Sequence, residues 1–63
     1  MGKTWSAKKE IDGDIFTLLG TSKTKSNATK RAEFARTKRK YVRVLNDTDI
    51  NGGFNYAIYI SRK

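Results

Sequence analysis

The chain has 63 residues and a formal net charge of +8, from 14 Lys and Arg against 6 Asp and Glu. This length allows one domain, which we expect to span residues 1–63. The absence of Cys, His and Pro excludes disulfides, Cys/His zinc sites and histidine-dependent catalysis. We therefore expect neither an enzyme nor a cofactor.

The apolar residues are scattered, and no run approaches the ~20 residues of a membrane helix. The N-terminal stretch also lacks the apolar centre of a signal peptide. We therefore expect an intracellular, cytoplasmic protein that does not associate with membranes. Three Tyr, three Phe and one Trp favour a folded domain over a disordered basic tail.

The first half of the chain predicts a β-hairpin, with strands over residues 4–11 and 14–19. Asp12 and Gly13 separate them, and both residue types tolerate the positive φ that a tight hairpin turn requires. A two-residue turn sets these cross-strand pairs: Ala7 with Leu18 and Lys9 with Phe16. A longer loop would shift that register, and the sequence leaves the choice open.

Residues 20–26 are polar and small, which is typical of a connection. We expect a helix over residues 28–40, with Ser26 or Asn27 as its N-cap. Its apolar face is narrow and made of small side chains, flanked by Phe34: Ala28, Ala32 and Ala35. Small residues of this kind let a helix lie close to a sheet.

Residues 41–45 predict a third strand, 46–53 a polar loop and 54–61 a fourth strand. The order ββαββ predicts an α+β fold in which one helix packs on a four-stranded, mainly antiparallel sheet, with the other sheet face open. The expected core residues are Phe16, Phe54, Tyr56, Ile58 and Ile60. This order is similar, at the level of fold, to that of small sheet-plus-helix DNA-binding domains such as integrase arm-binding modules.

The positive charge is concentrated in residues 23–43, where nine basic residues are opposed by Glu33 alone. The rest of the chain has a net charge of zero. Such concentration is typical of a protein that binds a polyanion, because neutralised phosphates release their condensed cations. The candidate phosphate-binding residues are Lys23, Lys25, Lys30, Arg31, Arg36, Lys38, Arg39, Lys40 and Arg43.

Two tyrosines are candidates for stacking on bases, because Tyr41 and Tyr59 are expected on the open face of the sheet. The carboxylate pairs of the chain lie in predicted turns and lack the spacing of a calcium loop. We therefore predict no metal site.

These features favour a small protein that binds nucleic acid through its basic helix, largely without regard to sequence. DNA and RNA, and duplex and single strand, remain open alternatives. The alternative function is a protein-interaction or oligomerisation module that docks an acidic protein or pairs through the open sheet face. Its expected anchors are Tyr41, Leu45 and Tyr59. Either way, we expect a monomer or a weak dimer.

Overall fold

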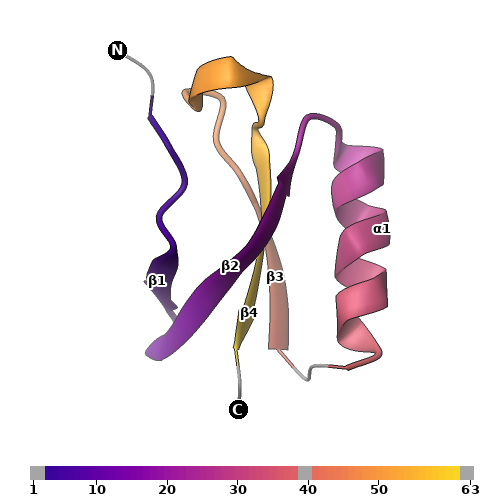
Figure 1. Cartoon of the computed structure of the whole chain (residues 1–63). Helices are drawn as coiled ribbons and strands as arrows, with labels where there is room; N and C mark the ends of the chain where they lie inside the picture. Colours follow the sequence, from indigo (N-terminus) through magenta and orange to yellow (C-terminus); the bar gives the residue numbers. More distant parts are fainter. Residues whose placement is uncertain (1–2, 39–40, 62–63) are drawn as a thin grey trace.

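The computed structural model describes residues 3–38 and 41–61 and confirms the α+β fold with one helix on a four-stranded antiparallel sheet (Figure 1). The elements in chain order are β1 (Lys8–Ile11), β2 (Asp14–Ser22), α1 (Lys25–Arg36), β3 (Tyr41–Asn46), the short 3₁₀ helix η1 (Asn51–Gly53) and β4 (Tyr56–Ser61). The strand order in the sheet is β1-β2-β4-β3. None of the described helices is long and apolar enough to cross a membrane.

The turn between β1 and β2 has two residues, which settles the hairpin register. Asp12 and Gly13 have φ angles of 53° and 82°, as the tight turn requires. Across the hairpin, Lys9 is paired with Phe16. The pairing that the shorter loop predicts is therefore the one observed.

Helix α1 begins and ends earlier than predicted. Thr24 is the N-cap, and its Oγ1 accepts a hydrogen bond from the backbone N–H of Asn27 at 3.2 Å. The extended backbone of Thr24 suits a cap, so the prediction of Ser26 or Asn27 was wrong. The helix ends at Arg36, and the predicted helical residues 39–40 lie outside the described part of the chain.

One core lies between α1 and the sheet. Ala28, Ala32 and Ala35 are buried there against Val42 and Ile58. The alanine stripe predicted from the sequence is therefore the contact face of the helix. Short side chains at this contact let a helix lie close to a sheet. Lys25 and Arg36 line a groove towards β3, and Arg31 lies over β2 on the other flank.

A second core covers the opposite face of the sheet, so the expectation of an open face was wrong. Phe16, Ala57 and Tyr59 are buried there, with Trp5 and Leu18 among the residues packed against them. The N-terminal stretch runs from β1 towards η1 instead of extending the first strand (Figure 1). Covering this face gives a small domain more buried apolar area than one helix can provide.

Hydrogen bonds attach this N-terminal stretch to the domain. The indole Nε1 of Trp5 donates to the carbonyl of Phe54 at 2.7 Å, and the Tyr59 hydroxyl donates to the carbonyl of Ser6 at 2.6 Å. Phe54 itself was predicted as a core residue, but it precedes β4 and is 42% exposed. Phe16 is in the core as predicted, although it faces away from the helix.

Candidate nucleic-acid interface

The positive charge of the described residues is carried on the side of α1. Residues 23–38 hold six basic side chains and one acid, Glu33, for a net charge of +5. The remaining described residues, 3–22 and 41–61, hold four basic and five acidic side chains, for a net charge of −1. The helix and the loop before it therefore form the one strongly cationic surface in the described part of the chain. We name its six basic members the helix cations: Lys23, Lys25, Lys30, Arg31, Arg36 and Lys38.

The ion pairs lie elsewhere. Lys3 is 3.7 Å from a carboxylate oxygen of Asp47 and 3.7 Å from one of Asp49, and Arg43 is 3.5 Å from Asp12. Within residues 3–38 and 41–61, none of the helix cations lies within ion-pair distance of a carboxylate. Their charges are therefore not neutralised inside the described structure.

Arg43 does not join the helix cations, although it was predicted as a phosphate-binding residue together with them. It is paired with Tyr59 across β3 and β4, and Tyr59 belongs to the core on the face away from α1. Its side chain is 49% exposed and contacts Asp12 of the hairpin turn. Alternation along β3 thus separates Arg43 from the helix. Arg39 and Lys40, the remaining two predicted residues, lie outside the described residues.

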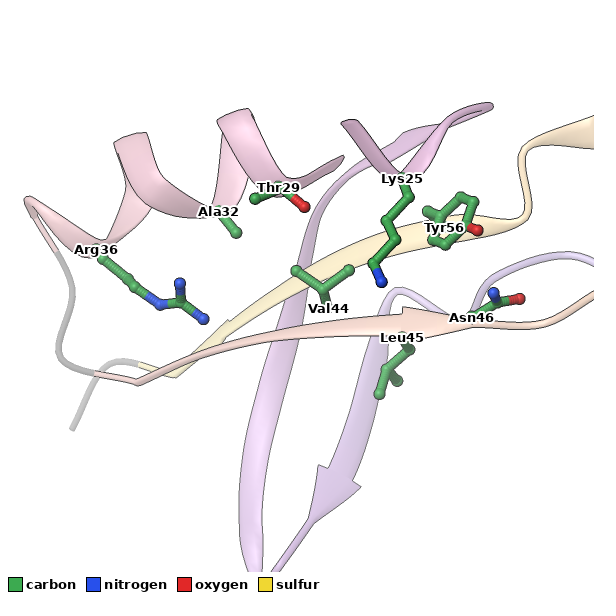
Figure 2. Close-up of a pocket in the computed structure, with 8 residues that line it drawn as sticks. All are labelled: Lys25, Thr29, Ala32, Arg36, Val44, Leu45, Asn46 and Tyr56. Atoms are coloured by element: carbon green, nitrogen blue, oxygen red, sulfur yellow. The ribbon is translucent and has the colours of Figure 1, made fainter. Parts of the chain in front are cut away.

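A groove of about 430 Å³ runs between α1 and β3 (Figure 2). Ala32 and Val44 form its apolar floor, while Lys25 and Arg36 extend into it from opposite ends of the helix (Figure 2). They are eleven residues apart, which separates their Cα atoms by roughly 16 Å along the axis. This arrangement places two cations along one concave surface, one from each end of the helix.

Neutral polar side chains line the same groove: Thr29 lies between the two cations, whereas Tyr56 and Asn46 lie beyond Lys25 (Figure 2). The hydroxyl of Thr29, the amide of Asn46 and the phenol of Tyr56 all lie along it (Figure 2). Such groups commonly donate hydrogen bonds to phosphate oxygens. Asn46 and Tyr56 were absent from the predicted site. The signal that points to Tyr56 is its hydroxyl, because a tyrosine among isoleucines needs a polar neighbour or water for that group.

The two candidate stacking residues have different surroundings. Tyr59 is fully buried, and this burial raises the pKa of its phenol above the ordinary value of 10.0. A base cannot reach that ring, so the assignment of Tyr59 as a stacking residue was wrong. Tyr41 is 41% exposed, but it lies on the sheet face away from the helix, opposite Ser61. Leu45, an expected anchor for docking, packs in the second core.

Lys23 lies at the loop that leads into α1. Its Nζ is 5.0 Å from the centre of the Phe54 ring, within the range of a cation–π contact. The described residues contain no group of three or more acidic side chains that could hold a metal ion.

Comparison of the chain with protein-family models, with curated proteins and with solved structures finds no match.

Proposed function

We propose that this protein binds nucleic acid by its phosphate backbone, through the helix cations and the groove between α1 and β3. The observation that supports this most is the segregation of charge: six basic side chains with a single acid among them, none paired with a described carboxylate. Like charges this close repel one another. A phosphate chain relieves that repulsion and releases its condensed cations.

The position of the charges along α1 also supports an anionic partner. The first turn of the helix contains Lys25 and no acid, although the positive end of the helix dipole there favours acidic side chains. Helix stability therefore does not explain this lysine. An anion bound near the start of the groove benefits from both the ammonium group and the dipole.

The contacts available are sequence-independent. The lysine and the arginine of the groove match phosphates, and the neighbouring hydroxyl and amide groups add hydrogen bonds without selecting a base. We expect binding to weaken steeply with salt. Four phosphate contacts to a single strand give a slope of about −2.8 in log K against log salt, or roughly a 50-fold loss between 50 and 200 mM.

The test is a fluorescence-anisotropy titration of labelled oligonucleotides at several salt concentrations. The double variant Lys25→Gln/Arg36→Gln removes both groove cations and is expected to weaken binding and make the slope shallower by about 1.4. The matched control, Lys8→Gln/Lys9→Gln, removes the same charge from β1. This strand lies at the edge of the sheet and pairs with residues 14–17 of β2.

The control is expected to keep nearly the affinity and slope of the unmodified protein. An equal loss in both double variants would show that net charge, not this surface, drives binding. The absence of binding to any strand at 50 mM salt would contradict the proposed function.

A further inference from the structure

The other flank of α1, towards β2, carries an exposed apolar groove. Two adjoining hollows of about 360 and 220 Å³ share Leu19 and Phe34 as walls. We name this the Leu19–Phe34 groove; its remaining lining residues are Gly20, Lys30, Arg31, Ala35, Lys38, Ile58 and Ile60.

The two walls are large apolar side chains that are exposed to solvent. Phe34 is 67% exposed and Leu19 is 51% exposed. Phe34 lies outside the alanine stripe that contacts the sheet, and Leu19 is the residue at which the β2–β4 register shifts. Neither side chain belongs to either core, and the two line the same hollows. Adjoining exposed apolar side chains of this kind are typical of a contact surface.

Cations surround this apolar surface. Lys30 and Arg31 line the larger hollow and Lys38 the smaller one. The Nζ of Lys38 lies 5.0 Å from the centre of the Phe34 ring. Arg31 extends over the backbone of β2, where a Cβ on Gly20 would lie 3.0 Å from its Nη1. Glu33, the acid of the helix, lines neither hollow.

We propose that the Leu19–Phe34 groove holds an unpaired base stacked on Phe34, while Lys30, Arg31 and Lys38 contact the adjacent phosphates. The partner is then single-stranded nucleic acid. This inference rests on the proposed function and names its substrate class. A duplex hides the faces of its bases and leaves Phe34 and Leu19 against water or phosphate. A single strand offers a flat apolar base and a phosphate within a few ångströms of each other, which matches an aromatic ring among cations.

The test compares two labelled strands of equal length and charge: oligothymidylate, and the same strand with abasic residues at its centre. The unmodified protein is expected to bind the base-containing strand about 5- to 150-fold more tightly, the usual effect of one stacked base. Phe34→Ala is expected to abolish this preference while keeping the affinity for the abasic strand and the salt slope. Phe34→Leu keeps an apolar side chain and is expected to lose most of the preference, because it removes the ring.

The chain offers a matched control in Phe54, which is also an exposed phenylalanine with a lysine 5.0 Å from its ring centre. Phe54→Ala is expected to keep the preference for the base-containing strand. Circular dichroism of each variant checks that it is folded.

Three results would overturn the inference. Equal affinity for the two strands, with the salt slope retained, would leave phosphate binding intact and remove the stacked base. Equal effects of Phe34→Ala and Phe54→Ala would show that the groove is not the site. Competition by polyglutamate as strong as that by oligothymidylate would assign the groove to an acidic peptide. No binding of any strand at low salt would instead contradict the proposed function itself.

Discussion

The second core depends on Tyr59, and replacing this residue by phenylalanine tests that core. The change keeps the ring, which lies edge-on to Trp5 with centroids 6.2 Å apart. It removes only the hydroxyl that donates to the carbonyl of Ser6 at 2.6 Å. We expect Tyr59→Phe to fold and to be less stable than the unmodified protein.

The magnitude follows from one lost hydrogen bond. Such a bond contributes about 1 kcal/mol net, and a domain of this length has a free energy of unfolding of roughly 3–9 kcal/mol. One kcal/mol lowers the melting temperature of so small a domain by about 4–8 °C. Trp5 is the sole tryptophan of the chain and contacts the altered ring, so its fluorescence reports the unfolding directly.

Tyr41→Phe is the matched control, because Tyr41 is 41% exposed; we expect it to change the stability by less than about 0.5 kcal/mol. The affinity for nucleic acid is expected to be unchanged in Tyr59→Phe. A variant as stable as the unmodified protein, or one that loses nucleic-acid affinity without losing stability, would refute the assignment of Tyr59 to a closed core.

The same residue gives a pH dependence with a defined sign. Because burial raises the pKa of Tyr59 above 10.0, the folded protein holds this proton more tightly than the unfolded chain. The stabilisation is complete below about pH 10 and is lost as the pH rises through the folded pKa. The difference in unfolding free energy between the unmodified protein and Tyr59→Phe is therefore expected to be constant below pH 10 and to shrink above it. A constant difference through pH 11 would contradict this.

Two further substitutions test the placement of α1. Thr24→Ala removes the hydrogen bond that the Thr24 side chain accepts from the Asn27 N–H, and it is expected to lower the free energy of unfolding by about 1 kcal/mol. Ser26→Ala, inside the first turn, is expected to lower it by less, as measured by thermal unfolding. The reverse order would contradict Thr24 as the N-cap. Ala32→Leu adds three carbons at a position 1% exposed and is expected to destabilise the domain by roughly 1–3 kcal/mol through overpacking. An unchanged melting temperature would mean that the helix does not lie against the sheet at this alanine.

The elements that were predicted well are those whose signals are local. The Asp12-Gly13 turn was predictable because both residue types tolerate the positive φ that the turn requires. The buried face of α1 was predictable from the spacing of its alanines. The ends of the helix were misplaced because Thr24, Ser26 and Asn27 are all competent caps, and the choice depends on how the chain leaves β2. The strand alternation placed Tyr41 and Tyr59 on the same face of the sheet, as observed.

The second core could not be predicted because its contacts join distant parts of the chain. Trp5 contacts Phe54 and Tyr59, which are about fifty residues away in the chain. The alternation that predicts a strand over residues 4–11 does not specify these contacts. The same limit explains the error at the candidate site. Tyr59 was taken as exposed because the helix covers only one face of the sheet. Phe34 was noted only as a neighbour of the alanine stripe, although a large aromatic outside that stripe is itself the sign of an exposed ring.

The register shift in β2 supplies one wall of the Leu19–Phe34 groove. Leu18 is paired with Tyr59 and Gly20 with the adjacent residue, Ile58, so Leu19 is an extra residue in the ladder. A chain lacking Leu19 would pair β2 with β4 without interruption, and one wall of the groove would be gone. Deleting this one residue would thus keep the fold and remove one wall of the groove. In evolutionary terms, a single inserted codon is enough to add this wall to an otherwise regular sheet.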